Sequence, residues 1–104
     1  SDVVCRYGGE EILVILPDCS LDEAALKAEE LRLRIEALSE IHGVSVSASI
    51  GISSIPQTST TAADLVAMAD KALYTAKANG RNCVVRHKTR AEPVETPTVM
   101  TIAR

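Results

Sequence analysis

The sequence predicts an α+β domain in which helices cover one face of a mostly antiparallel sheet. Three observations support this prediction: short runs rich in β-branched residues, two longer segments with helical spacing of apolar residues, and turn residues between them. The expected order is β-β-α-β-α-β. With 104 residues, 46% hydrophobic residues and a net charge of -3, the chain suits one small globular domain.

A β-hairpin is expected at the beginning of the chain. Its strands are Val3–Tyr7 and Ile12–Leu16, joined by a Gly8-Gly9 pair that can adopt positive φ at both central positions of a tight turn. Such a turn leaves its backbone amides open to a ligand. Glu10-Glu11 follows the turn, and because successive side chains of a strand point to opposite faces, only one carboxylate can face a given ligand.

The segment Leu21 to Glu40 has apolar residues spaced for one face of a helix. Ser20 is placed to cap this helix, and Glu23 completes a capping box. Val44–Ile52 then alternates apolar residues with Ser and Gly, which predicts a strand with one buried face. The small face, Ser45, Ser47 and Ser49, favours close packing of a helix over a role for any of these serines as a nucleophile.

A second helical pattern runs from Leu65 to Ala76 after a Ser- and Thr-rich loop at residues 56–61, and Gly80 is placed as the residue that ends it. Asn82–Arg86 is expected to form a short strand. Residues 1–86 therefore form the predicted domain. Residues 87–104 contain Pro93, Pro97 and several Thr without a clear period, and we interpret them as a linker or disordered tail.

Composition argues against several function classes. With no Trp or Phe, two Tyr and a mildly acidic balance, the chain lacks the features of a nucleic-acid-binding face. The apolar run Ile12–Leu16 is far shorter than a membrane span, so no membrane contact is expected for this segment. Three cysteines without metal-type spacing favour reduced thiols in the cytoplasm over a disulfide framework.

Two groups of residues could support chemistry. The Glu10-Glu11 pair suits a hard cation such as Mg²⁺, which prefers oxygen ligands and few protein contacts; solvated charges at a hairpin tip are the alternative. Lys77 and Arg81 are four residues apart, so a continuing helical turn would let both grip a polyphosphate. The alternative is ordinary helix termination, in which cations complement the helix dipole.

Taken together, three ordered motifs resemble the GGDEF family of diguanylate cyclases. They are Arg6-Tyr7-Gly8-Gly9-Glu10-Glu11-Ile12, Ser49-Ile50-Gly51-Ile52, and the run Ala69-Asp70, Ala72-Leu73-Tyr74, Ala76-Lys77 and Gly80-Arg81-Asn82. The resemblance covers residues 1–86 and corresponds to the C-terminal part of such a domain. It implies a nucleotide-cyclase, ferredoxin-like α+β fold.

The resemblance also implies a function: condensation of two GTP molecules into cyclic di-GMP with release of pyrophosphate, in bacterial signal transduction. Each subunit of a homodimer would hold one GTP, with Mg²⁺ or Mn²⁺ as cofactor. Glu10 matches the acidic metal ligand of the family and Glu11 the second catalytic acid. Gly8-Gly9 matches the backbone that approaches the nucleotide, and Lys77 and Arg81 match the residues that hold the β- and γ-phosphates.

Some residues depart from the family's pattern. Ile12 replaces the final Phe of the motif, and Glu10 replaces an Asp in a variant that the family tolerates. Asp2 matches the last residue of the family's Arg-x-x-Asp product-inhibition motif, whose Arg would precede Ser1; a surface charge at a strand start is the alternative. The family's first half supplies further metal and guanine ligands, so this chain, as a fragment, is expected to be inactive alone.

Three functional hypotheses follow. In the first, the chain is part of an active cyclase located in the cytoplasm, or in the cytoplasmic part of a membrane-bound sensor. In the second, it is a degenerate GGDEF domain that acts as a cyclic di-GMP or GTP receptor or as a regulatory scaffold. In the third, it is an α+β interaction module without nucleotide chemistry.

Overall fold

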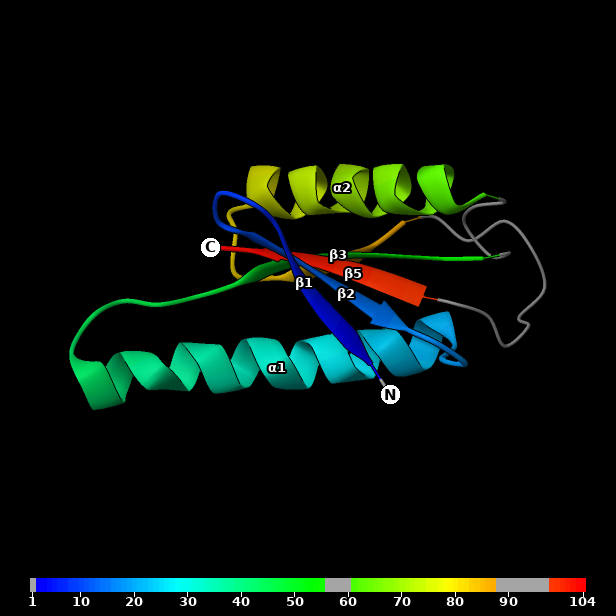
Figure 1. Ribbon diagram of the computed structural model, residues 1–104. Helices are drawn as coiled ribbons and strands as arrows, with labels where there is room; N and C mark the ends of the chain where they lie inside the picture. The colour runs from blue at the N-terminus through cyan, green and yellow to red at the C-terminus, as the bar shows by residue number, and fades with distance from the viewer. Residues whose placement is uncertain (1, 56–60, 88–97) are drawn as a thin grey trace.

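The computed structural model describes residues 2–55, 61–87 and 98–104 (Figure 1). Within them the order of elements is β1 (Val3–Gly8), β2 (Glu11–Leu16), α1 (Leu21–His42), β3 (Ser49–Ser54), α2 (Ala62–Ala78), β4 (Val84–Arg86) and β5 (Thr98–Ala103). The strands form one sheet in the order β1-β2-β5-β3-β4, in which β3 and β4 are parallel and every other neighbouring pair is antiparallel. The predicted α+β class with a mostly antiparallel sheet is confirmed.

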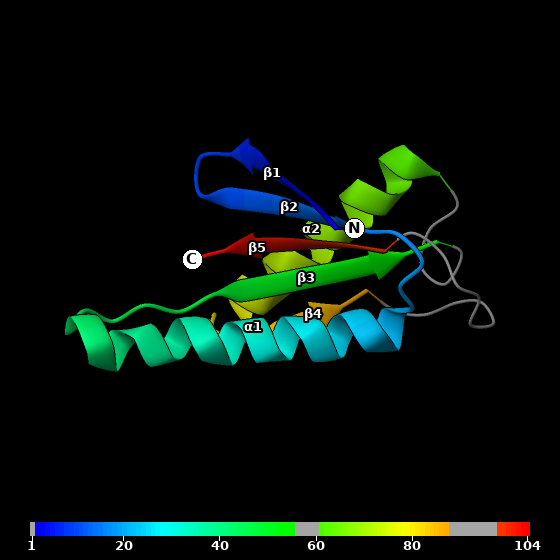
Figure 2. The same cartoon turned by 60° about the horizontal axis from the view of Figure 1, so that its bottom comes forward.

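The two helices lie on opposite faces of the sheet, which corrects the expectation that both cover one face (Figures 1 and 2). On the α1 face the core is aliphatic and includes Leu16, Ala24, Ile50, Ile52 and Met100. On the α2 face the sheet presents small and hydroxylated residues near Gly51 and, beside them, the apolar side chains of Val99, Leu13 and Ile15. Because both faces are covered, all six residues of β3 are buried, including its serines.

Close approach of α2 to β3 depends on Gly51. A Cβ at this position would lie 2.2 Å from the Leu73 backbone nitrogen and 2.3 Å from the Ala69 carbonyl oxygen. Nearby hydroxyls use the helix carbonyls as acceptors: Ser53 Oγ donates to the Leu65 oxygen, and Thr101 Oγ1 donates to the Ala69 oxygen at 3.1 Å. The small residues of the motif around Gly51 therefore bring the helix backbone onto the sheet.

The predicted start of α1 is confirmed. Glu23 N donates to Ser20 Oγ at 3.1 Å, and Ser20 N donates to the Glu23 side chain at 3.1 Å, which completes the capping box. At the other end, Gly43 adopts φ +69° and closes the helix. The strand expected from Val44 begins at Ser49, because Val44 is 62% exposed and lies outside the covered sheet.

The prediction that residues 87–104 form a linker or disordered tail is wrong for Thr98–Ala103. This segment is β5, which pairs with β2 on one side and β3 on the other and is buried at every position. A strand covered on both faces needs no alternation of polar and apolar residues, and Thr98–Ala103 accordingly has no two-residue period. The part of the expected tail at 88–97, and the loop expected at 56–60, lie outside the described residues.

Within the described ranges, neither helix is long and apolar enough to cross a membrane.

Candidate functional site

The hairpin tip differs from its prediction by one residue. Gly8 pairs with Glu11 and Arg6 with Ile12, so the register shifts between Arg6 and Gly8, and the two turn residues are Gly9 and Glu10. Neither Gly8 nor Gly9 has φ in the left-handed region, which corrects the expected double positive-φ turn. The register shift leaves one extra residue on β1, as in a β-bulge, which increases the local twist of a strand. Glu10 consequently lies in the turn itself.

The two carboxylates have different surroundings. Glu10 is exposed at the tip, whereas Glu11, the first residue of β2, is half-buried toward α2. The Arg6 guanidinium donates to the Gly9 carbonyl oxygen at 3.3 Å across the turn. A ligand at the tip therefore meets Glu10 from solvent and Glu11 from the side of the helix.

The end of α2 is a Schellman motif. Arg81 N donates to the Ala76 oxygen at 3.0 Å and Gly80 N donates to the Lys77 oxygen at 3.3 Å, with Gly80 at φ +108°. This confirms Gly80 as the residue that ends the helix. It also shows that the helical turn does not continue to Arg81, because Arg81 has φ +64°. The chain folds back instead, which keeps Arg81 near Lys77.

The turn after α2 is fixed from both sides. Asn82 N donates to Ser49 Oγ at 3.1 Å, and the Asn82 side chain donates to Glu36 of α1 at 2.6 Å. Arg32 of α1 donates in turn to the Asn82 side-chain oxygen at 3.0 Å. The backbone that presents Arg81 is therefore tied to both β3 and α1.

The hairpin tip and the end of α2 meet in one hollow of about 410 Å³. All six residues that the sequence singled out for catalysis or substrate binding line it, together with one that it did not; the lining consists of Gly8, Gly9, Glu10, Glu11, Lys77, Arg81 and Arg104. Two acidic residues, Glu10 and Glu11, and two basic residues, Lys77 and Arg81, thus border the same space. Residues nearly seventy positions apart in the chain are brought together by the packing of α2 on the sheet.

Arg104 is the residue that sequence reasoning missed. It follows β5 directly, and its Nε lies 3.3 Å from Glu10 Oε1. Its main-chain oxygen accepts a hydrogen bond from Arg81 Nη1 at 2.6 Å. No motif in the sequence points to this residue, because its position depends on β5 entering the sheet between β2 and β3.

Asp70 extends the site. It lines a smaller adjoining hollow of about 210 Å³ with Glu11, Tyr74 and Lys77. Its Oδ1 is buried without a hydrogen-bond partner among the described residues. Burial, and after it the negative charge of Glu11, raises the pKa of the Asp70 carboxyl. Asp70 lies within a motif that resembles the GGDEF family, but nothing in that motif indicates the burial of its carboxyl oxygen.

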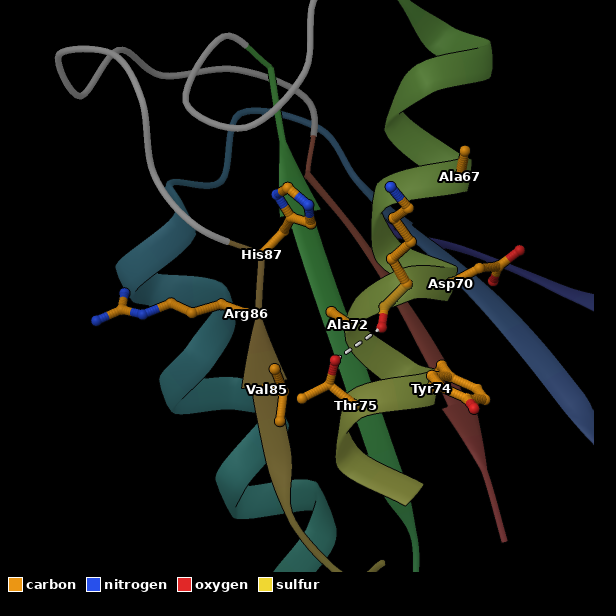
Figure 3. A pocket seen from close by; sticks show the side chains of 9 residues that line it. Ala67, Asp70, Ala72, Tyr74, Thr75, Val85, Arg86 and His87 are labelled. Carbon is orange, nitrogen blue, oxygen red and sulfur yellow. Dashed lines mark hydrogen bonds between the residues drawn. The ribbon is translucent and has the colours of Figure 1, made fainter. Parts of the chain in front are cut away.

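A larger hollow of about 650 Å³ lies between α2 and β4 (Figure 3). Its polar side chains do not converge. Figure 3 shows Arg86 extending away toward α1, where it pairs with Asp22, while Asp70 and Tyr74 leave α2 on the other side. Thr75 uses its hydroxyl within the helix, donating to the Lys71 oxygen at 3.2 Å. The hollow of about 410 Å³ at the hairpin tip is the better candidate site, because its charged residues border a common space.

The structure does not bring Asp2 to this site. Asp2 immediately precedes β1, at the end of that strand opposite the hairpin tip, and its carboxylate lies 4.0 Å from Lys27 Nζ of α1. A role in binding an inhibitory product would therefore involve a surface separate from the hollow.

Carboxylate oxygens at the site are few. Within the part of the chain that the structure describes, no group of three or more Asp, Glu, His or Cys residues is arranged to hold a metal ion. Glu10 and Glu11 nevertheless fit the manner in which Mg²⁺ is bound beside phosphates, by one or two carboxylates with the remaining positions left to water and substrate.

The site therefore consists of a two-glycine hairpin beside a Lys and an Arg at a helix end, on an α+β sheet. The family model of the GGDEF domain of diguanylate cyclases matches residues 1–83. The chain belongs to the GGDEF family.

Relatives agree with this assignment. The chain is 42% identical over 89 residues to the response regulator PleD of Caulobacter vibrioides, covering 81% of this chain and 20% of that protein. It is 41% identical over 91 residues to diguanylate cyclase A of Treponema denticola, covering 85% and 24%. It is 37% identical over 87 residues to the diguanylate cyclase DosC of Escherichia coli, covering 81% and 19%.

The chain thus spans about a fifth to a quarter of the length of these relatives. No solved structure matches it. Because the family match ends at residue 83, β5 and Arg104 lie outside the part shared with the family.

Proposed function

We propose that this chain supplies part of the catalytic site of a diguanylate cyclase, which condenses two GTP molecules into cyclic di-GMP and releases pyrophosphate. The observation that supports this proposal most strongly is the shared hollow of the hairpin tip and the end of α2. Carboxylates can hold the metal ion and cationic side chains can hold the phosphates of a metal-bound triphosphate, and the hollow has two of each.

Lys77 and Arg81 are proposed to hold the β- and γ-phosphates of GTP. Both are at the end of α2, and the Schellman motif directs Arg81 back toward Lys77. Charge-assisted hydrogen bonds from ammonium and guanidinium groups to phosphate oxygens are the stronger class of hydrogen bond. Gly8 and Gly9 have open space where a Cβ would be, so the hairpin backbone can approach the nucleotide without hindrance.

Glu10 is proposed as the metal ligand and Glu11 as the second acid of the site. Mg²⁺ or Mn²⁺, when bound, would supply positive charge against the phosphates. Glu10 reaches the hollow from the turn, so it can bind from the solvent side, while Glu11 reaches it beside Lys77 and Asp70. The two acids would thus approach a bound metal from two sides, Glu10 from the turn and Glu11 from the side of α2.

The proposed reaction joins the 3′-oxygen of one GTP to the α-phosphorus of another. The bond between this phosphorus and the pyrophosphate oxygen breaks, and the 3′-hydroxyl loses its proton. Two such steps close the cyclic dinucleotide, so two GTP sites must face each other, and we propose a homodimer as the active form. Because GTP is a cytosolic nucleotide, the site is proposed to work in the cytoplasm.

The test is production of cyclic di-GMP by the natural protein that contains these residues, measured by mass spectrometry with GTP and Mg²⁺. A Glu10→Gln variant is the matched change because it keeps the shape of the side chain and removes its charge. Product that appears with the wild type and is lost in the variant supports the proposal. Cyclic di-GMP that binds without any synthesis would instead make this a receptor, and neither binding nor synthesis would leave a scaffold.

A further inference from the structure

The turn that follows α2 has an uncommon backbone conformation. Gly80, Arg81 and Asn82 have φ of +108°, +64° and +49°, so three consecutive residues have positive φ. Glycine adopts such angles readily and asparagine does so more often than most residues, whereas an arginine is rarely found there. Contacts from elsewhere in the fold are therefore needed to hold Arg81, the proposed phosphate ligand, in this conformation.

The side chain of Asn82 supplies such a contact with α1. Its oxygen accepts a hydrogen bond from Arg32 Nη1 at 3.0 Å, and its Nδ2 donates to Glu36 Oε2 at 2.6 Å. Because a cation faces the amide oxygen and a carboxylate faces the amide nitrogen, only one orientation of the amide satisfies both partners. The main-chain nitrogen of Asn82 donates to Ser49 Oγ at 3.1 Å, so the residue next to Arg81 is held at both its backbone and its side chain.

Arg32 is itself fixed in place. Its Nε and Nη2 donate to the two carboxylate oxygens of Glu29, at 2.9 and 2.5 Å. Its side chain is only 13% exposed, whereas that of Arg34, two residues further along α1, is 76% exposed. Bidentate pairs of arginine and carboxylate have a defined geometry, so Arg32 presents its Nη1 to Asn82 from a fixed position.

We propose that Arg32 is a positioning residue for Arg81. It acts through Asn82: its hydrogen bond to the Asn82 side chain holds the turn in the left-handed conformation, and this conformation returns Arg81 to the hollow. The inference rests on the proposed function, because it concerns how a proposed ligand of the β- and γ-phosphates is held. Arg32 does not line the hollow, so it affects phosphate binding without contacting the phosphate.

The connection reaches from one face of the sheet to the other. α1 and α2 lie on opposite faces, and the turn after α2 leads to β4 at the edge of the sheet beside β3 (Figures 1 and 2). Arg32 and Asn82 meet although 50 positions separate them in the sequence. The place of Arg81 in the hollow therefore depends on the packing of α1 as well as on that of α2.

Loss of the Arg32 contact is expected to leave Arg81 present but less well ordered. Without this contact the turn can relax toward backbone conformations that arginine prefers, and phosphate binding must then restore the ordered turn. Ordering one long side chain on binding corresponds to a loss of affinity of about two- to tenfold. A purely structural role for Arg32 would instead produce changes that do not depend on Arg81.

The test is calorimetric titration of the natural protein that contains these residues with pyrophosphate and Mg²⁺. Arg32→Gln is expected to weaken binding about two- to tenfold, because glutamine lacks the charge and the paired donors. Arg32→Lys keeps a cationic donor without the bidentate geometry and is expected to give an intermediate affinity. Arg34→Gln is the control, since Arg34 is an exposed arginine of the same helix, and it should leave affinity unchanged.

The decisive comparison repeats Arg32→Gln in an Arg81→Ala background. A positioning residue acts only through its target, so Arg32→Gln should weaken binding when Arg81 is present and have no effect when it is absent. Wild-type affinity in Arg32→Gln, or an equal loss in both backgrounds, overturns the inference. Asn82→Ala removes the same contact and leaves the pair of Arg32 with Glu29 intact, so it should give the same result even where the fold does not tolerate Arg32→Gln.

Lys77→Ala separates this inference from the proposed function. If pyrophosphate binding depends on Lys77 and Arg81 while Arg32→Gln has no effect, the positioning role is wrong and the proposed function stands. If binding depends on neither Lys77 nor Arg81, the hollow is not the phosphate site and both proposals are wrong.

Discussion

The centre of the sheet and its hairpin edge differ in how far their residues are buried. In the centre, every residue of β3 and β5 is buried between the two helices. At the edge, Val3 and Val4 of β1 are 49% and 67% exposed, and the hairpin tip is open to solvent. The residues that stabilise the fold are therefore separate from those that we propose to bind a ligand, so we expect substitutions to change one property without the other.

The largest effect is expected from Gly51→Ala in the centre. The new Cβ would meet backbone atoms of α2 at 2.2 and 2.3 Å, so the helix must move off the sheet. We expect the free energy of unfolding in urea to fall by about 3 kcal/mol or more, beyond the usual cost of overpacking.

Gly9→Ala at the edge is the matched control, because a Cβ there meets nothing within 4 Å. Its effect on stability is expected to stay within about 1 kcal/mol. Equal losses at the two glycines would contradict the separation of centre and edge.

Met100→Ala tests whether β5 belongs to the core. Met100 is 3% exposed and packs in the α1-side cluster, so its truncation should lower the free energy of unfolding by about 2–3 kcal/mol, as buried Met to Ala changes do. Val4→Ala, at an exposed position of β1, should change it by less than about 0.5 kcal/mol. A Met100 variant as stable as wild type would show that β5 leaves the sheet in solution.

Lys77→Ala tests the proposed phosphate binding in the hollow beside the hairpin edge. Loss of a charge-assisted hydrogen bond is expected to weaken pyrophosphate binding about tenfold, which corresponds to about 1.4 kcal/mol. The midpoint of thermal unfolding should hardly move, since Lys77 is in the last turn of α2 and its side chain faces the hollow. Lys71→Ala, at an exposed lysine of the same helix, is the control; a similar loss of affinity there would indicate nonspecific attraction.

The smallest effect is expected at Asp70. Burial, followed by the charge of Glu11, raises the pKa of Asp70 above its ordinary value of 3.8. At a pH between the ordinary pKa and the raised folded-state pKa, the folded chain binds more protons than the unfolded chain. Ionised Asp70 therefore lowers the free energy of unfolding at neutral pH. This destabilisation decreases as the pH falls below the folded-state pKa toward the ordinary value.

Asp70→Asn should therefore stabilise the chain modestly at neutral pH. The gain should shrink on acidification toward the ordinary pKa of Asp, measured by urea unfolding at several pH values. A gain that stays constant with pH would show that the charge of Asp70 is not the cause.

The sequence predicted the elements that depend on local signals. Ser20 and Glu23 identify the start of α1, and Gly80 identifies the end of α2, because caps are made by residues close in sequence. The six site residues were found for the same reason: each lies in a short motif. The convergence of the hairpin with α2 could be expected only through the family resemblance.

What was missed depends on long-range packing. β5 has no alternating pattern, because both of its faces are covered, and Arg104 reaches Glu10 only through the pairing of β5 with β2 and β3. The turn residues are Gly9 and Glu10, and not the predicted Gly8 and Gly9, because the strand register shifts between Arg6 and Gly8. No local sequence signal indicates this shift. The burial of Asp70 likewise depends on how α2 lies over the sheet.

We propose that the hairpin tip and the end of α2 form one site for a metal-bound polyphosphate. The most direct measurement is an NMR titration of the chain with GTP and Mg²⁺, following the backbone amides of Gly9 and Arg81. We predict that both signals shift with the same dissociation constant, and that Lys77→Ala weakens both together. Shifts at one amide alone, or at different concentrations of GTP, would contradict a common site.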